Sequence, residues 1–215
     1  MDGDRDVHEL SIRERHAAGD LQAAADLVLR AYGVQIQRFL AARSRDRTCA
    51  DEAYAEFEFD LWRGLAGFRW ECSARVWVYT LARRAMIRCS QRARQRQRRE
   101  VLRSQPGQNK ACTVRTETRT ALRTRSKQRI QELWRQLPEA DQTLLLLRIS
   151  RQLEWKEIAC VMGASTDPQR ALEVETARLR KRFQLVKAKL RKLADEDGLL
   201  AGRTVQTPSQ DCDPC

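Results

Sequence analysis

The chain has 215 residues, of which 41 are Lys or Arg and 29 are Asp or Glu, so its formal net charge is +12. Its longest apolar runs are about five residues, far short of the roughly 20 that a membrane-spanning helix needs. The charged N-terminus also lacks the apolar core of a signal peptide. These features argue against a membrane protein, and they predict a cytoplasmic protein of one or two small domains.

Charge is distributed unevenly along the chain. Residues 1–60 carry 8 Lys or Arg against 13 Asp or Glu, whereas residues 61–215 carry 33 against 16. An acidic front and a basic remainder predict attraction to a polyanion. We expect nucleic acid, because clustered cations gain affinity when they release counterions from its phosphates.

Helical periodicity dominates the first half of the chain. Residues 20–44 repeat apolar side chains at helical spacing, and Asp20 is a suitable N-cap. Residues 49–68 carry one apolar stripe with acids between its members. Residues 73–99 begin with apolar and aromatic side chains and end in a run of arginines. The sequence therefore predicts three helices in this half.

Composition predicts the domain boundaries. An N-terminal arm over residues 1–19 precedes a helical domain over residues 20–100. Residues 101–127 lose periodicity and gain Pro, Gly, Asn and Thr, which is typical of a flexible linker. A second helical block follows over residues 128–193, and we expect the tail over residues 194–215 to be disordered.

The cysteines do not predict a metal site. Five of the seven are scattered singly and suit reduced, apolar positions. Cys212 and Cys215 have a spacing that metal ligands use, but a metal site needs about four ligands. The two histidines, His8 and His16, lie at the other end of the chain. We therefore expect no metal and no cofactor.

A short apolar segment, residues 153–163, precedes a long basic one. The short segment predicts a helix that ends at Gly163, and Asp167 and Pro168 then suit the start of another helix. The apolar stripe of this second helix consists of Leu172, Leu179, Phe183, Val186, Leu190 and Leu193. The pattern predicts a helix-turn-helix, in which the first helix braces the second in the DNA major groove. An ordinary helical hairpin with a solvated basic face is the alternative.

The stretch LPEADQTLLLLRISRQLEWKEIACVMG resembles the C-terminal domain of bacterial sigma factors of the extracytoplasmic-function (ECF) type. The matching residues are Leu137, Pro138, Glu139, Leu147, Arg148, Glu157, Ile158, Ala159 and Gly163. The stretches DEAYAEFEFDLWRGLAGF and VWVYTLARRAMIRCSQRARQRQRR are similar to the polymerase-binding and promoter-melting helices of that family, in the family's order. The resemblance implies an all-α protein of two helical domains joined by a flexible linker, the second a helix-turn-helix.

The resemblance also implies core RNA polymerase and promoter DNA as partners. Docking on polymerase is assigned to Glu52, Glu56, Asp60 and Trp62, where acids recur at four-residue spacing beside an apolar seam. A helix face that is both acidic and apolar can bind a basic coiled coil. A solvated helix face is the alternative for these residues.

Contact with the −10 promoter element is assigned to Trp77, Arg83, Arg84, Arg88 and Arg92. Arginines suit the backbone of melted DNA, and aromatic side chains suit unpaired bases. The family usually has Asn at the position of Arg84 and Asp at that of Arg88, which weakens the case for recognition of a flipped base there. The alternative for Trp77 is a structural role in the protein core.

Contact with the −35 element is assigned to Thr176, Arg178 and Lys181, which match the family's DNA-contacting positions. This chain has extra residues after Gly163 relative to the family. If they extend the reader helix rather than the turn, Arg170 leads the contact instead.

The predicted function is that of a sigma factor, which binds core RNA polymerase and directs promoter recognition and transcription initiation. We do not expect an enzyme, because no Gly-rich phosphate loop, His-centred triad or converging carboxylate pair is visible. An anti-sigma factor is a further partner to consider. The alternatives are a helix-turn-helix regulator that acts without polymerase and a basic RNA-binding or scaffold protein. The regulator leaves the acidic and aromatic N-terminal half unexplained.

Overall fold

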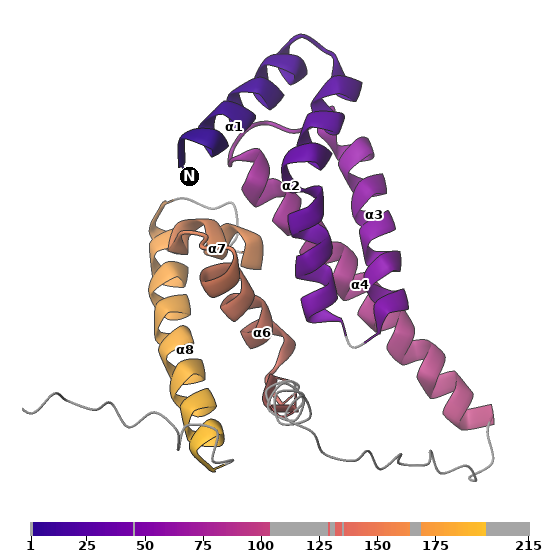
Figure 1. The fold of residues 1–215 in the computed structure, drawn as a ribbon, viewed down its shortest axis with the longest axis vertical. Coiled ribbons are helices and arrows are strands. Elements are labelled where there is room, and N and C mark those ends of the chain that lie inside the picture. Colours follow the sequence, from indigo (N-terminus) through magenta and orange to yellow (C-terminus); the bar gives the residue numbers. More distant parts are fainter. Residues whose placement is uncertain are drawn as a thin grey trace, which may run out of the picture.

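The computed structural model describes residues 2–44, 46–103, 129, 132–134, 136–163 and 169–196. Its elements are α1 (Asp2–Ala17), α2 (Leu21–Arg43), α3 (Arg47–Leu65), α4 (Ala74–Arg103), α6 (Glu139–Leu145), the π-helical turn η1 (Leu146–Ser150), α7 (Trp155–Met162) and α8 (Gln169–Glu196). None of the described residues lies in a β-strand, which confirms the all-α class. Figure 1 shows α1 to α4 as one bundle, here the N-terminal bundle, and α6 to α8 as a second group, here the C-terminal domain.

Three long helices form the centre of the N-terminal bundle because each has an apolar face to bury. Asp20 caps α2 as predicted, since its carboxylate accepts a hydrogen bond of 3.1 Å from the backbone N–H of Ala23. Helix α3 packs on both α2 and α4. In the core, Phe39 of α2 and Tyr79 of α4 meet edge to face, with ring centroids 5.5 Å apart.

The N-terminal arm predicted over residues 1–19 is largely a helix of the bundle, α1, which packs on α2. Ile12 is buried in the core. The carboxylate of Glu9 accepts hydrogen bonds from the backbone N–H groups of Ala74 and Arg75, at 2.8 and 2.9 Å. These are free N–H groups of the first turn of α4, so α1 caps a helix far along the chain. The sequence did not indicate this packing, because α1 is charged throughout.

The C-terminal domain is the predicted helix-turn-helix. Helix α7 begins after Glu154, whose backbone N–H donates to the carboxylate of Glu157 at 2.7 Å, and it ends at Gly163, where φ is +95°. A position with a left-handed backbone conformation favours glycine, so Gly163 indicated from the sequence alone where the helix ends. Three apolar residues of α8 are buried as predicted, namely Leu179, Phe183 and Val186. The expected helix start at Asp167 and Pro168 lies outside the described residues.

Two predicted boundaries shift in the structure. Helix α4 continues to Arg103, so it enters the segment predicted as a linker over residues 101–127. The remainder of that segment, residues 104–127, lies outside the described residues. Helix α8 ends at Glu196, and the rest of the predicted tail, including both terminal cysteines, also lies outside them.

The N-terminal bundle and the C-terminal domain pack against each other. Helix α7 lies against α4, and α6 lies near α2. One cluster of buried apolar side chains extends through both groups. The sequence predicted a chain connection between two domains, but it did not predict this direct contact.

Candidate polymerase and DNA interfaces

The predicted acidic residues of α3 face the arginines of α4. Arg88 donates to the carboxylate of Glu56 at 3.1 Å and to that of Asp60 at 2.5 Å. Arg92 also forms an ion pair with Glu56. The side chain of Asp60 is only 13% exposed. Residues that the sequence assigned to two separate partners therefore bind each other in the free chain.

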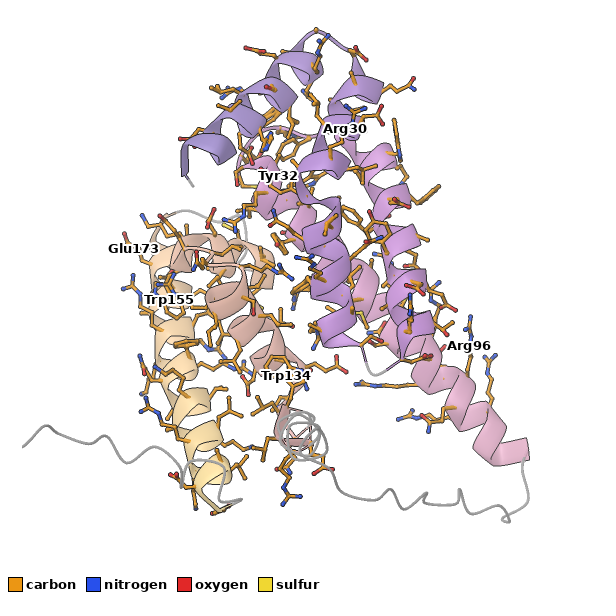
Figure 2. The ribbon with its side chains drawn as sticks, in the orientation of Figure 1. Arg30, Tyr32, Arg96, Trp134, Trp155 and Glu173 are labelled. Carbon is orange, nitrogen blue, oxygen red and sulfur yellow. The ribbon has the colours of Figure 1, made fainter. Side chains whose placement is uncertain are left out.

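The pairing of α3 acids with α4 arginines continues one turn nearer the C-terminal end of α4. Arg96, labelled in Figure 2, forms an ion pair of 3.3 Å with Glu52 of α3. Both side chains are partly exposed, so water and salt weaken this pair. The acids of α3 thus form a continuous counter-charge to one face of the arginine run.

The exposed outer face of α3 carries two aromatic side chains. Trp62 is 45% exposed and Phe59, three residues earlier on the same face, is 64% exposed. The guanidinium of Arg63 lies 5.6 Å from the centroid of the Phe59 ring. Sequence analysis found Trp62 but missed Phe59, although its position off the buried stripe of Phe57 and Leu61 indicated a second exposed aromatic residue.

The structure favours the core alternative for Trp77. Its ring stacks on Phe68 with centroids 4.6 Å apart and an interplanar angle of 19°. A Cβ atom at Gly64 would lie 3.1 Å from the Trp77 ring, so the indole fits closely against α3. The stack on Phe68 covers one face of the indole, and the side chain is partly buried against the core.

The remaining arginines predicted for the −10 element differ in exposure. Arg83 is half-buried, and burial lowers the pKa of its guanidinium, with the nearby Arg84 guanidinium adding to the effect. Arg84 itself is exposed. Of this pair, Arg84 is therefore the more accessible to DNA.

Thr176 does not belong to the exposed face of α8. Its side chain is buried, with 7% exposure, and among the described residues its hydroxyl oxygen has no hydrogen-bond partner. Thr176 fills the step between Leu172 and Leu179 on the apolar stripe, because residues three and four apart share a helix face. The assignment of Thr176 to DNA contact was therefore wrong. The seven-residue step between Leu172 and Leu179 in the predicted stripe indicated that a residue between them is buried.

The other predicted −35 residues point to solvent. Arg178 is exposed and forms an ion pair of 3.6 Å with Glu175 on its own helix. Lys181 is also exposed. Val174, one turn before Arg178 on this face, is 65% exposed and was missed by sequence analysis. Arg170 lies within α8, but its side chain is outside the described part of the structure.

Side chains of α6, η1 and α7 fix the orientation of α8. Trp155, at the start of α7 and labelled in Figure 2, packs edge to face on Phe183 with centroids 5.4 Å apart. The guanidinium of Arg148 lies 4.9 Å from the centroid of the Trp155 ring. Arg182 of α8 forms an ion pair of 2.5 Å with Asp141 of α6. The exposed face of α8 is therefore held on a rigid base.

The cysteines behave as small apolar residues in the described parts of the chain. Burial raises the pKa of the Cys72 thiol to about 11 and also raises those of Cys89 and Cys160. These thiols stay protonated at neutral pH, which disfavours nucleophilic chemistry. The described residues contain no group of three or more His, Cys, Asp or Glu side chains that could hold a metal ion. Within the same residues, no helix combines the length and apolarity required to cross a membrane.

Comparison with known proteins identifies the family. No family model matches the chain. The RNA polymerase sigma factor YlaC of Bacillus subtilis (strain 168) is 30% identical to it over 167 residues, which cover 74% of this chain and 87% of the relative. The chain belongs to the RNA polymerase sigma factors. This result confirms the family that the motifs of both halves indicated.

A solved structure supports the fold of this sigma factor. The sigma factor RpoE from Bartonella quintana, determined in complex with the anti-sigma factor NepR, matches with a TM-score of 0.54 at 14% sequence identity. The match covers 83% of this chain and 98% of RpoE. The relationship to YlaC, and not this structural likeness, favours sigma-factor function over a regulator without polymerase and over a basic scaffold protein.

Proposed function

We propose that this sigma factor uses three separate helix faces, one for each of its binding tasks. The outer face of α3 binds core RNA polymerase, the arginines of α4 hold the −10 DNA, and the outer face of α8 reads the −35 element. The observation that carries this division is the arrangement of α8, whose apolar stripe is buried while Val174, Arg178 and Lys181 lie on the opposite, exposed face.

Docking on polymerase would use an apolar centre with an acidic edge. Phe59 and Trp62 supply the exposed aromatic surface, and exposed aromatic side chains often provide much of the binding free energy at protein interfaces. Glu52, which is partly exposed, and the neighbouring acids add attraction for a basic partner. Phe59 is an addition to the sequence-based assignment, which combined the acids with Trp62 on a face that is both acidic and apolar.

Binding of the −10 element would rest on phosphate contacts. Arg84 is exposed, whereas Arg88 and Arg92 are held by carboxylates that phosphates must replace. Guanidinium groups bind phosphate and carboxylate with similar geometry, so the exchange needs no rearrangement of the helix. Trp77 has a structural role in this proposal, because its ring is partly buried and stacks on Phe68.

Reading of the −35 element would combine a polar and an apolar contact. Arg178 can pair bidentately with guanine in the major groove, and the side chain of Val174 can contact a thymine methyl group. Lys181, one turn further along, suits a phosphate or a base edge. Arg170 remains a candidate for the leading contact, since α8 begins at Gln169.

The setting of this function is cytoplasmic, and the chain acts as a specificity subunit rather than as an enzyme. An anti-sigma factor is a further partner that we propose, by analogy with the complex in which RpoE was solved. No metal and no cofactor takes part in the proposed mechanism.

Pull-down with core RNA polymerase, followed by run-off transcription on genomic fragments, tests the proposal. We expect the full chain to co-purify with core polymerase at moderate salt and to direct transcripts from discrete start sites. Binding to DNA without any association with core polymerase would instead support the regulator that acts alone.

A further inference from the structure

Helix α4 continues well past the core that it helps to form. Among its described side chains, Cys89 is the last that is buried, and all those from Gln91 to Arg99 are exposed. The helix nevertheless runs on to Arg103. Residues 91–103, here called the α4 extension, span about 20 Å at the rise of an α-helix. Figure 1 shows this part of α4 projecting beyond α3.

Local propensity explains why the α4 extension is helical. Its residues are Gln, Arg, Ala, Glu, Val and Leu, and all of these except Val favour helices. Most helices in proteins also gain stability from an apolar face packed on a core. The described side chains of the extension have no such face. They are therefore free of any packing requirement and available to a binding partner.

Positive charge is concentrated in the α4 extension. It contains six Arg and one acid, Glu100. Four-residue spacing joins Arg92 with Arg96 and Arg94 with Arg98, and like charges at this spacing destabilise a helix. An anion that binds along the helix relieves this repulsion.

The acids of the described residues pair with only the first turns of the α4 extension. Arg96 forms an ion pair of 3.3 Å with Glu52 of α3, and Arg94 also has an acidic partner. Arg98 and Arg99 are exposed, and no acid among the described residues pairs with them. Charge complementarity therefore predicts that an external polyanion binds the end of the helix.

The residue types of the α4 extension suit the backbone of a duplex better than unpaired bases. Proteins bind single strands with cationic groups together with aromatic side chains on which the bases stack. The extension contains no aromatic residue. Arginines without stacking partners contact phosphates and do not read sequence. Duplex DNA is therefore the polyanion that these side chains fit.

The location of the α4 extension indicates which duplex it meets. In the proposed function Arg84, Arg88 and Arg92 hold the −10 DNA, and the extension continues the same helix. RNA synthesis needs an unpaired template strand at the start site, which lies downstream of the −10 element. The DNA that stays paired next to this element therefore lies on its upstream side. A helix segment of about 20 Å can follow roughly six base pairs of it.

We propose that the α4 extension is a further DNA-binding site, in which Arg98 and Arg99 bind phosphates of the duplex spacer between the −10 and −35 elements. The inference rests on the proposed binding of the −10 element by α4. The contact supplies affinity that depends on salt and not on the sequence of the spacer. It adds a duplex contact between the two elements that the sigma factor recognises.

The test uses core polymerase reconstituted with the full chain and a promoter fragment that this enzyme transcribes. Arg98→Gln with Arg99→Gln removes two charges and retains good helix formers. The matched control, Arg30→Gln with Arg38→Gln, removes two exposed charges from α2. Figure 2 shows Arg30 far from Arg96 of α4. A third variant, Arg98→Lys with Arg99→Lys, keeps the charge and changes its shape.

Each protein is measured on two DNA fragments that share one −10 element. The complete fragment has duplex DNA from the −35 element to the −10 element, whereas the shortened fragment begins at the −10 element. Competition binding at several salt concentrations gives the affinity and its salt dependence. Hydroxyl-radical footprinting maps the protected backbone, and circular dichroism checks helical content.

On the complete fragment we expect the glutamine variant to bind about 3- to 10-fold more weakly at low salt. The slope of log K against log salt concentration should fall by about 0.9 for each lost phosphate contact. Protection of the spacer backbone next to the −10 element should also be lost. The lysine variant should retain most of the affinity, and the α2 control should match the wild type. On the shortened fragment all four proteins should bind alike.

Equal affinity of the wild type and the glutamine variant for the complete fragment would overturn the proposal. An equal loss on both fragments would also overturn it, because the arginines would then contact single-stranded or downstream DNA. A similar loss in the α2 control would reduce the effect to net charge and reject the site. If the double variant loses helical content, the single variant Arg98→Gln decides the question in the same assay.

Run-off transcription by the wild type separates these outcomes from failure of the proposed function. Transcription by the wild type together with unchanged spacer binding in the glutamine variant rejects only the spacer site. Absence of transcription by the wild type with core polymerase rejects the proposed function itself.

Discussion

The arginines of α4 and the basic residues of α8 have similar chemistry but different surroundings. Arg88 and Arg92 of α4 are paired with acids of α3, which lies beside them. In α8, Arg178 and Lys181 point to solvent, and Arg178 pairs with Glu175 of its own helix. The comparison teaches that Arg88 must give up a contact with a neighbouring helix to bind DNA, whereas Arg178 would give up only an ion pair on its own helix. In the proposed function, the face of α8 that would read the −35 element is accessible in the free chain, whereas Arg88 and Arg92 of α4 would have to exchange carboxylates for phosphates.

The largest expected effect concerns the buried face of α8. Leu179→Ala should lower the free energy of unfolding by about 2–5 kcal/mol, because it removes a buried side chain and leaves a cavity. Leu185→Ala, on the exposed face of the same helix, should change it by about 0.5 kcal/mol or less. Chemical denaturation of both variants measures the difference, and equal effects would contradict the assignment of the two faces of α8.

Removal of a base contact from α8 comes next in size. Arg178→Ala should remove about 1–3 kcal/mol of discrimination at one or two base pairs of the −35 element. Lys189→Ala, further along the exposed surface, should alter affinity modestly without altering sequence preference. Selection of sites from a random duplex pool compares both variants with the wild type. The same sequence preference in all three proteins would show that α8 does not read DNA through Arg178.

A smaller effect is expected on the outer face of α3. Trp62→Ala should weaken binding to core RNA polymerase about 10-fold, as expected for loss of an exposed aromatic contact at an interface. Val34→Ala, an exposed apolar position on α2, is the control and should leave the affinity unchanged. A titration of labelled sigma factor with core polymerase measures both, and parallel losses would point to a general effect on the bundle.

Neutralising the acids of α3 that face α4 should modestly strengthen DNA binding, whereas the substitutions described above weaken stability or binding. The double variant Glu56→Gln with Asp60→Asn should bind single-stranded DNA roughly 2- to 5-fold more tightly at low salt, because Arg88 and Arg92 then have no carboxylate partner on α3 that phosphate must replace. High salt should remove the gain. Asp51→Asn, which affects only the exposed pair with Arg47, is the control. A loss of affinity in the double variant would refute the competition between carboxylate and phosphate.

The smallest change is expected at Thr176. Thr176→Val replaces a buried hydroxyl that lacks a partner among the described residues with a methyl group of similar size. The free energy of unfolding should stay within about 1 kcal/mol of the wild-type value or rise, because no hydrogen bond is lost. The preferred −35 sequence should not change, and an altered preference in the same selection experiment would restore Thr176 to the DNA-contacting face.

The sequence by itself determined the features that depend on residues close together in the chain, namely the buried helix faces and the helix ends. Helical spacing predicted the buried stripes of α2, α3 and α8, Asp20 predicted the start of α2, and Gly163 predicted the end of α7. The family followed from motifs that are themselves local. Even the burial of Thr176 was readable, because its place between Leu172 and Leu179 is fixed by the helical repeat alone.

Only the tertiary structure decided which faces meet. The cap that Glu9 supplies to α4, the ion pair of Glu56 with Arg88 and the bond from Arg43 to Glu139 join residues that are far apart in the chain. Each depends on how one helix is rotated and shifted against another, and no spacing within a single helix specifies that relation. The acids of α3 and the arginines of α4 were therefore predictable as charged faces, but their pairing with each other was not.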